Sequence, residues 1–240
     1  MSAPQFFVPR LLAGERVPLG PDDARHAVGS LRLRAGDVVR LADGDGAVGS
    51  ATVVEAGRGN AVLEVGAVER VARPSPSLSV ALAPPKGDRL SWAVQKLAEV
   101  GVDEVILLQT ERSIRRWEGE RAAGTIDRLS AVAREAAMQS RRPFVTRVAG
   151  PAPLAGVVSG VAGVIVLWEQ ATDGFGAALE RSAGDVRLVV GPEGGLAEEE
   201  VDRCVAAGAV TASLGEGILR TETAALAASV VALTHLGRLG

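Results

Sequence analysis

A chain of 240 residues with 47% hydrophobic residues can bury the core of one large domain or of two modest ones. Its 26 lysines and arginines stand against 29 aspartates and glutamates, and the formal charge of -3 excludes a uniformly basic nucleic-acid-binding protein, so any contact with nucleic acid needs a local basic patch. The single cysteine, Cys204, excludes an internal disulfide and a cysteine-built zinc site, and no apolar run approaches the roughly 20 residues of a membrane helix, so a cytoplasmic location is expected.

The first predicted elements are short strands. Residues 38–41, 48–54 and 61–65 show strand-like apolar patterns, and the Asp-Gly-Asp-Gly sequence at 43–46 predicts a turn between the first two. These features favour a small antiparallel barrel. Residues 70–77 contain two prolines and no apolar period, which predicts a linker and the end of a first domain.

After the linker, apolar runs alternate with helical patterns, which is typical of a parallel sheet. The runs span residues 78–83, 104–108, 164–167, 186–190 and 211–214. The clearest helix is predicted at Arg89–Val100, with Gly101 at its end. Two further helices are predicted at about 125–140 and 221–236. The last of these is apolar nearly all round and should be buried by the sheet or by a second subunit.

Two glycine-rich segments, 190–195 and 214–224, each follow a predicted strand and precede a helix. Glycines let the backbone approach a ligand closely, and α/β sheets bind ligands at this edge. Three glutamates, 198–200, disfavour a phosphate there, and the glycine fingerprints of dinucleotide sites and P-loops are absent. The alternative is purely structural: a tight turn in the first segment, and in the second a helix start with Thr221 as its N-cap and Arg220 merely solvated.

Polar and basic residues gather near the end of the predicted helix at 125–140. Glu135 and Gln139 are four residues apart and share a helix face. The arginines at 141 and 142 could complement the helix dipole or contact nucleic acid. The same alternatives, a solvated loop or an RNA patch, apply to the arginines that follow the second run of the sheet, Arg112, Arg115 and Arg116.

Taken together, these segments resemble the ribosomal RNA small subunit methyltransferase E family, of the knotted SPOUT class. The resemblance is carried in family order by Pro85–Arg89, Gln95–Gly101, Glu135-Ala136 with Gln139-Ser140, Gly191–Gly195, and Leu214-Gly215 with Ile218–Ala224. Upstream, Phe6–Val8, Arg25-His26 and Leu31-Arg32 resemble the N-terminal PUA-like barrel of the family. Two residues depart from its pattern: Gly217 replaces a basic residue, and Ala197 stands where a small hydroxyl residue often caps a helix.

The resemblance implies an α/β fold in two domains. Residues 1–72 would form a PUA-like, RNA-binding antiparallel β-barrel, and residues 73–240 a SPOUT domain with a parallel sheet and a deep trefoil knot in about 164–236. It also implies S-adenosylmethionine-dependent methylation of N3 of a specific uridine in small-subunit (16S) ribosomal RNA. The partners implied are a second copy of the chain and ribosomal RNA within the assembled subunit, without a membrane.

The resemblance places the cofactor in a crevice between three loops. The residues assigned to it are Leu167, Glu169, Val190, Gly191, Pro192, Glu193, Gly194, Gly195, Leu214, Gly215, Ile218, Leu219, Thr223 and Ala224. The candidate RNA-binding residues are Arg25, Arg32, Arg34, Lys86, Arg89, Arg112, Arg115, Arg116, Gln139, Arg141 and Arg142.

Methylation of uracil N3 requires loss of the N3 proton, after which negative charge spreads over the flanking carbonyl oxygens. Arg220 is assigned to stabilise that charge and Glu222 to accept the proton, although water could also accept it. No metal is expected, because the two histidines, His26 and His235, are far apart in the chain. Cys204 is expected to be an inert, partly buried thiol.

Three other functions remain open at this point. A SPOUT methyltransferase could act on a different RNA target, such as a ribose hydroxyl or transfer RNA. A non-catalytic RNA-binding ribosome assembly factor could use the barrel alone, although both glycine loops are present. A small-molecule enzyme on a doubly wound sheet would need the missing nucleotide fingerprint.

Overall fold

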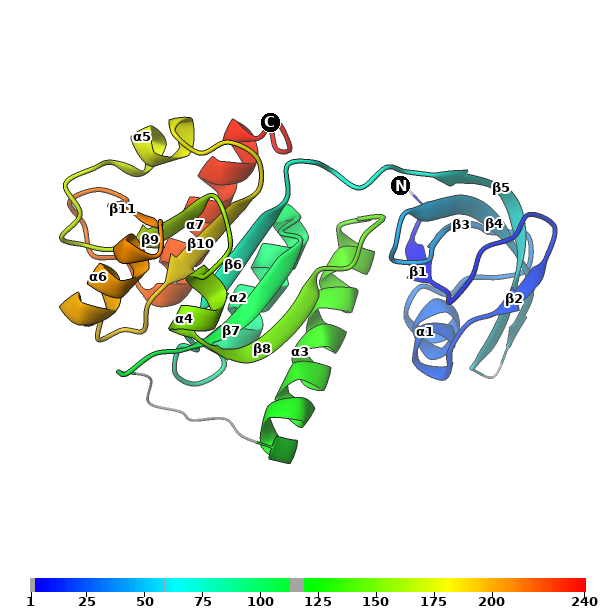
Figure 1. Cartoon of the computed structure of the whole chain (residues 1–240). Coiled ribbons are helices and arrows are strands. Elements are labelled where there is room, and N and C mark those ends of the chain that lie inside the picture. Colours follow the sequence, from blue (N-terminus) through cyan, green and yellow to red (C-terminus); the bar gives the residue numbers. More distant parts are fainter. Residues whose placement is uncertain (1–2, 58, 113–118) are drawn as a thin grey trace. The chain divides into compact units, whose positions relative to one another are not determined.

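The computed structural model describes residues 3–57, 59–112 and 119–240 of the chain (Figure 1). The chain divides into two compact units. The first combines Met1–Arg73 with Ala137–Val145, and the second combines Pro74–Ala136 with Thr146–Gly240.

The first unit is built on a five-stranded sheet with the order β1-β3-β4-β5-β2. Its strands are β1 (Gln5–Phe7), β2 (Arg16–Pro18), β3 (Val38–Ala42), β4 (Ala47–Gly57) and β5 (Asn60–Arg70). Helix α1 (Pro21–Arg25) and a π-helical turn, η1 (His26–Ser30), follow β2. The three predicted strands are confirmed. The sheet is antiparallel except for the pairing of β1 with β3, which is parallel, and β1 and β2 are its edges.

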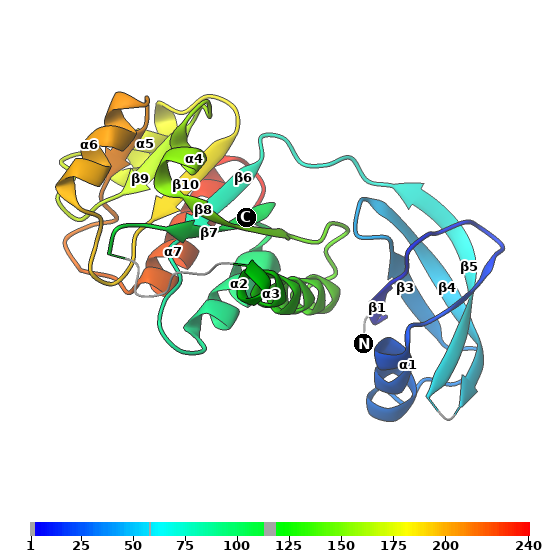
Figure 2. The ribbon, with the colours of Figure 1, turned by 60° about the horizontal axis from the view of Figure 1, so that its bottom comes forward.

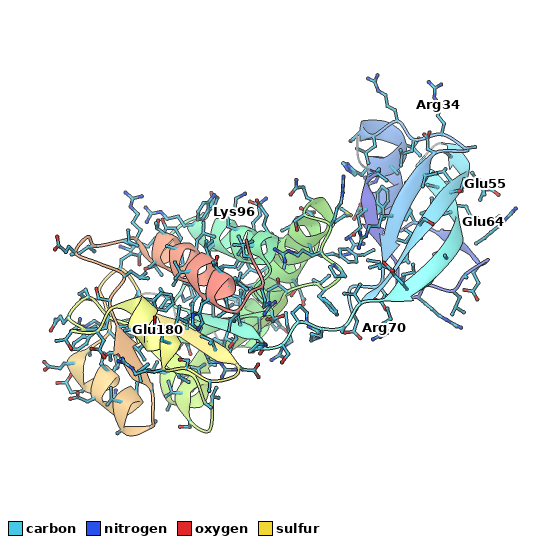
Figure 3. The ribbon with its side chains drawn as sticks, turned by 90° about the horizontal axis from the view of Figure 1, so that it is seen from above. Arg34, Glu55, Glu64, Arg70, Lys96 and Glu180 are labelled. Atoms are coloured by element: carbon cyan, nitrogen blue, oxygen red, sulfur yellow. The ribbon has the colours of Figure 1, made fainter. Side chains whose placement is uncertain are left out.

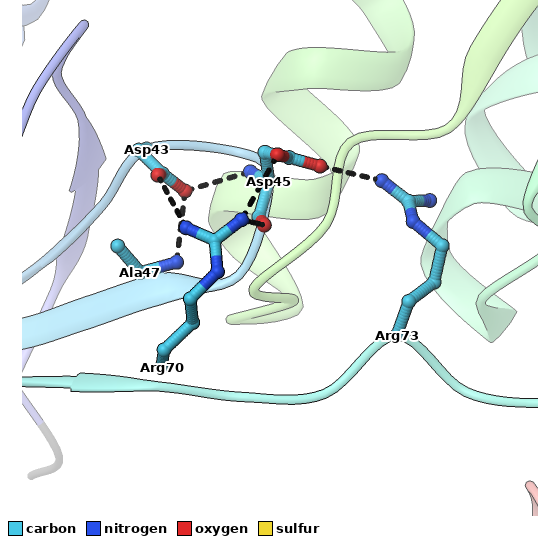
Figure 4. Close-up of polar contacts among 5 residues, drawn as sticks. All are labelled: Asp43, Asp45, Ala47, Arg70 and Arg73. Carbon is cyan, nitrogen blue, oxygen red and sulfur yellow. Dashed lines mark hydrogen bonds and ion pairs between the residues drawn. The ribbon is translucent and has the colours of Figure 1, made fainter.

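The predicted turn between β3 and β4 is fixed by polar contacts (Figure 4). The carboxylate of Asp43 accepts hydrogen bonds from the main-chain N–H groups of Asp45 and Ala47, at 2.7 and 3.0 Å. Asp45 in turn pairs with Arg70 at 3.2 Å and with Arg73 at 2.8 Å. The segment that follows β5 is therefore tied back to the turn that precedes β4.

The second unit contains a six-stranded sheet with the order β11-β9-β10-β6-β7-β8, and every neighbouring pair in it is parallel. Its strands are β6 (Leu78–Leu82), β7 (Glu104–Gln109), β8 (Arg147–Pro153), β9 (Val164–Leu167), β10 (Val186–Val190) and β11 (Val210–Ala212). The alternation of apolar runs with helices correctly predicted this parallel sheet, because parallel neighbours need crossover connections. Strand β8 was not among the predicted runs.

Helices cover both faces of the parallel sheet (Figures 1 and 2). The helices are α2 (Arg89–Val100), α3 (Gly119–Gln139), α4 (Leu154–Val158), α5 (Phe175–Glu180), α6 (Glu198–Ala206) and α7 (Thr221–His235). Successive strand residues point to opposite faces. Leu78, Val80 and Leu82 of β6 share one apolar cluster with α2, α3, α5 and α7. The opposite face, with Ala81 of β6, packs against α4 and α6.

Helix α7 packs against α2 and against the central strands β6 and β10. Its buried face includes Ala225, Ala228 and Ala232, small residues that allow a close approach to the sheet. Val231, on another side of the helix, is 46% exposed, so the sheet does not bury α7 all round. Within the described parts of the chain, no helix is long and apolar enough to cross a membrane.

Candidate functional site

A cavity of about 280 Å³ opens at the carboxyl ends of β9, β10 and β11, the edge at which α/β sheets bind ligands. Three chain segments wall it, one after each strand. The lining residues are Leu167, Trp168, Glu169, Val190, Gly191, Pro192, Glu193, Gly194, Gly195, Leu196, Ala212, Ser213, Leu214, Gly215, Gly217, Ile218, Leu219, Thr221 and Ala224. All residues assigned to the cofactor from the sequence lie here except Thr223, which is exposed on α7 and does not line the cavity.

Two glycines shape the loop after β10. Gly195 has a φ of +69°, and a Cβ at this position would lie 3.2 Å from Oε1 of Glu169. A Cβ at Gly191 would lie 3.0 Å from the side chain of Leu196. Because neither position has room for a side chain without a shift, the loop exposes its backbone to the cavity.

The charge of the cavity lining is negative. Glu169 and Glu193 are its ionisable residues, and the described lining contains no lysine or arginine. A phosphate group would meet no cation among these lining residues, whereas a cationic ligand would be attracted to the two carboxylates. The absence of a nucleotide fingerprint in the sequence agrees with this charge.

Arg89, the first residue of α2, lies between two glutamates, one in the loop after β10 and one in the first turn of α7. Its Nη1 is 3.8 Å from Oε1 of Glu193, and its Nε is 3.7 Å from Oε1 of Glu222. The main-chain N–H of Lys86 also donates to Oε1 of Glu193, at 3.2 Å. Glu222 is only 7% exposed, and its Oε2 has no hydrogen-bond partner in the parts of the chain that are described.

The start of α7 is joined to the loop after β10. The hydroxyl of Thr221 donates to the carbonyl oxygen of Gly191 at 3.2 Å. The alternative in which Thr221 is the N-cap is wrong, because the N-cap is Arg220, which makes no side-chain capping bond. Arg220 is exposed, so its guanidinium can reach solvent or a ligand.

Behind the glycine loop, a buried carboxylate organises the next segment. Glu200 accepts hydrogen bonds from the main-chain N–H groups of Glu111 and Ala197, at 2.8 and 2.9 Å. Arg112 donates from Nη1 to the carbonyl oxygen of Gly194 at 2.9 Å. The chain after β7 thus supports the loop that walls the cavity.

The candidate RNA-binding residues are divided between the two units. Arg25, Arg32 and Arg34 are exposed in the first unit, and Arg34 extends away from the strands whereas Glu55 and Glu64 project from β4 and β5 (Figure 3). Arg25 pairs with Asp22. The remaining candidates of the first unit are Gln139, Arg141 and Arg142. The candidates of the second unit are Lys86, Arg89 and Arg112. Two further candidates, Arg115 and Arg116, lie outside the described residues.

Cys204 lies on α6, beside a second cavity of about 410 Å³ between α4 and α6. The thiol is buried, and burial raises its pKa, so it stays protonated at neutral pH. A protonated thiol is a poor nucleophile, as expected for an inert cysteine. Residues 3–57, 59–112 and 119–240 contain no group of three or more metal-ligating side chains.

Comparison with known proteins identifies both parts of the chain. Residues 73–233 match a family described as an RNA methyltransferase domain, and residues 19–66 match an RNA methyltransferase PUA domain. The fold and the site thus define a two-part protein, an RNA methyltransferase domain preceded by a PUA domain.

More specific relatives share most of their length with the chain. Ribosomal RNA small subunit methyltransferase E of Mycobacterium bovis is 36% identical over 95% of this chain and 90% of its own length. The protein of the same name in Bacillus subtilis is 30% identical over 85% of this chain and 84% of its own. The chain therefore belongs to the ribosomal RNA small subunit methyltransferase E family.

A solved structure agrees with this assignment. The crystal structure of a ribosomal RNA small subunit methyltransferase E from Neisseria gonorrhoeae, bound to S-adenosyl methionine, superposes with a TM-score of 0.86. It is 27% identical in sequence, and the match covers 97% of this chain and 98% of that one.

Proposed function

We propose that the chain uses S-adenosylmethionine to methylate N3 of a specific uridine in small-subunit (16S) ribosomal RNA. The observation that carries the proposal is the negatively charged cavity between glycine loops, in a member of this methyltransferase family. The crystal structure of the relative from Neisseria gonorrhoeae is bound to this cofactor, which supports the assignment of S-adenosylmethionine to this chain.

The residues of the cavity fit S-adenosylmethionine. The cofactor carries a sulfonium cation, ribose hydroxyls and an adenine ring, and it supplies an electrophilic methyl group. Glu169 offers carboxylate oxygens to a cation or to hydroxyls, and the exposed backbone near Gly195 offers hydrogen-bonding groups. Leu167 and Leu214 supply apolar surface for a ring. A volume of about 280 Å³ is close to the lower end of the usual size of small-molecule sites, roughly 300 Å³.

Two residues outside the lining are proposed to act on the uracil. Glu222 is proposed to accept the N3 proton, since its Oε2 has no hydrogen-bond partner among the described residues. Arg220 is proposed to stabilise the negative charge that then spreads over the carbonyl oxygens, since it is exposed two residues before Glu222. The Thr221 hydroxyl holds this segment against the loop after β10.

The proposal includes a division of labour and a knot. Residues 1–72 would bind RNA, residues 73–240 would hold the cofactor, and the chain would form a deep trefoil knot within about 164–236. The knot is proposed from the family to which the chain belongs, and the segments after β9, β10 and β11 that would form it wall one cavity.

The proposal also includes a homodimer in the cytoplasm, acting on RNA within the assembled small subunit. Trp92 on α2 and Val231 on α7 are exposed apolar side chains on two helices that pack side by side, which supports a second copy as their cover. Light scattering of the purified protein tests this part. A mass of two chains is expected, and a monomer that retains full activity would contradict it.

Methyl transfer tests the proposal directly. The protein is incubated with methyl-labelled S-adenosylmethionine and with either small ribosomal subunits or naked small-subunit RNA. We expect label in RNA, with assembled subunits as the better substrate. Cofactor binding without any transfer to either substrate would instead indicate a binding-only assembly factor.

A further inference from the structure

Arg89 stands at a position that is unfavourable for a cation. It is the first residue of α2, where the positive end of the helix dipole repels a guanidinium. The sequence analysis placed Arg89 among the candidate RNA-binding residues. In the structure its guanidinium instead lies between two carboxylates from distant parts of the chain, Glu193 and Glu222, which compensate for the unfavourable position.

The two carboxylates belong to different walls of the site. Glu193 lies in the glycine loop after β10 and lines the cavity, whereas Glu222 lies in the first turn of α7. A guanidinium carries a permanent positive charge spread over a plane, so it can attract two carboxylates at once, here at ion-pair distances of 3.8 and 3.7 Å. Arg89 thus links the start of α2 to both segments.

Glu222 depends on this link more than Glu193 does. The side chain of Glu222 is 9% exposed, against 28% for Glu193. A buried carboxylate needs a compensating charge, and Arg89 is the cation found paired with Glu222 within the described ranges. Glu193 also receives the main-chain N–H of Lys86, which does not depend on any side chain.

We infer that Arg89 is a positioning residue, which fixes the glycine loop and the start of α7 relative to each other through Glu193 and Glu222, and that it does not act as a phosphate ligand. The inference rests on the proposed function for its catalytic consequence, because the residue it positions, Glu222, is the proposed base. Its structural consequence, the joint ordering of the glycine loop and the start of α7, does not depend on which reaction the protein catalyses.

Hydrogen exchange tests the structural consequence without any activity measurement. In Arg89→Met, amides in 191–195 and 221–225 should exchange faster together, at least several-fold, with the rest of the sheet unchanged. Arg128→Met is the matched control, since Arg128 also contacts α2, through a 2.6 Å hydrogen bond to Ser91, but reaches neither loop. Unchanged exchange in both segments would overturn the inference, even if the protein methylates RNA.

A double-mutant cycle tests the catalytic consequence. Arg89→Met should lower kcat by about tenfold with little change in KM for the ribosomal substrate. In a protein that already carries Glu222→Gln, the same substitution should lower kcat little further. Arg89→Lys, which keeps the charge, should recover part of the loss and serves if the methionine variant does not fold.

A phosphate ligand would behave differently. Arg89→Met would then raise KM, reduce the salt slope of RNA binding by about one, and cost the same in either background. That result would overturn the inference and leave the proposed function intact. A wild-type protein that binds the cofactor but transfers no methyl group would contradict the proposed function, while the exchange experiment would still decide the role of Arg89.

Discussion

At the residue scale, Ala197 shows how a missing hydroxyl is partly compensated. It is the N-cap of α6 and has no side-chain acceptor, but its main-chain N–H donates to Oε2 of Glu200 three residues later, at 2.9 Å. This is one half of a capping box, in which a serine or threonine would supply the other half. The helix therefore begins where the family pattern predicts, with one capping contact fewer.

Ala197→Ser should stabilise the protein by about 0.5–1 kcal/mol, because a serine hydroxyl can accept a hydrogen bond from a main-chain N–H group of the first turn. Urea unfolding at neutral pH measures the change. Ala207→Ser, at the other end of α6, is the control and should have no such effect. Equal unfolding midpoints for the two variants would show that the first turn has no unsatisfied donor to cap.

Gly217 is the second departure from the family pattern. A Cβ there would meet no atom within 4 Å, and its φ lies outside the left-handed range, so a larger residue fits. Gly217→Lys should tighten binding to small-subunit RNA and steepen its salt dependence by about one. Gly176→Lys adds the same charge to open space on α5 and controls for net charge. An effect of equal size in both variants would remove any special role for position 217.

Residue identities in the site were predictable where a motif carried them. The glycine loop after β10 and most of the segment after β11 reach the cavity as expected. Trp168, Leu196 and Ser213 were missed, although each adjoins an assigned segment or predicted strand. Thr223 was assigned because it belongs to a motif, but the turn of α7 directs it to solvent.

At the element scale, the C-terminal segment is held by one buried pair. Arg238 donates to both carboxylate oxygens of Asp103, at 2.6 and 3.1 Å, and also to the carbonyl oxygens of Pro76 and Gly101. Both charged side chains are largely buried, with 11% and 14% exposure. The end of the chain is thereby fastened to the segments around β6 and the end of α2.

Arg238→Met should destabilise the protein by about 3 kcal/mol, because it leaves the Asp103 carboxylate buried without its cation. Thermal or urea unfolding measures the loss. The exposed pair of Arg181 with Asp173 provides a control, and Arg181→Met should cost less than about 1 kcal/mol. Similar losses in the two variants would mean that burial does not strengthen the Arg238 contact.

The ion pairs of Asp45, in the turn before β4, with Arg70 and Arg73 should make the stability of the protein depend on pH. The hydrogen bond from Arg73 is the largest cause that holds the pKa of Asp45 below its ordinary value of 3.8, with Arg70 contributing. A carboxyl group with a lowered pKa stabilises the fold above its unfolded-state pKa, and this contribution is lost as the pH falls through the folded-state pKa. The carboxylate of Asp45 therefore favours folding at neutral pH but not in strong acid.

Asp45→Asn should lower stability at neutral pH and reduce its decline below about pH 4, where the wild-type protein progressively loses the stabilisation that this carboxylate provides. Urea midpoints of wild type and variant from pH 7 to pH 3 give the comparison. Asp173→Asn, at another exposed ion pair, is the control. Parallel pH curves for wild type and Asp45→Asn would contradict the role of this contact.

Elements with a strong period were predictable, and short irregular ones were not. Helix α2 and strands β9 and β10 match their predicted bounds, because α2 has a helical apolar period and the two strands are mostly apolar. Strand β8 contains two prolines and lies at the edge of the sheet, where a missing N–H is tolerated. Helices α4 and α5, of five and six residues, are too short to show a helical period.

At the scale of the whole molecule, the chain returns to the first unit at the end of α3. Residues 137–145 pack there: Phe144 lies 4.5 Å below the guanidinium of Arg73, and Gln5 donates from Nε2 to the carbonyl oxygen of Arg142. No local sequence pattern predicts this return, because it depends on contacts between residues far apart in the chain, such as Gln5 and Arg142, which are 137 positions apart. The apolar period of the helix at 125–140 gave no sign of it.

RNA binding by the first unit should depend on its exposed arginines. Arg32→Gln with Arg34→Gln should weaken binding to small-subunit RNA and lower the salt slope by about two, with unchanged affinity for S-adenosylmethionine. Filter binding at several salt concentrations measures the affinity for RNA and its salt slope. The control is Arg121→Gln with Arg128→Gln, which removes the same number of positive charges from α3. An unchanged slope for the first pair would exclude these phosphate contacts.

Methylation of uridine N3 is tested by the identity of the nucleoside that the protein modifies. Small ribosomal subunits from a strain that lacks its own enzyme are incubated with the protein and methyl-labelled S-adenosylmethionine, and the RNA is digested and analysed by mass spectrometry. We expect label in 3-methyluridine at a single site. Label in any other nucleoside would contradict the uridine N3 assignment and leave a methyltransferase with a different target.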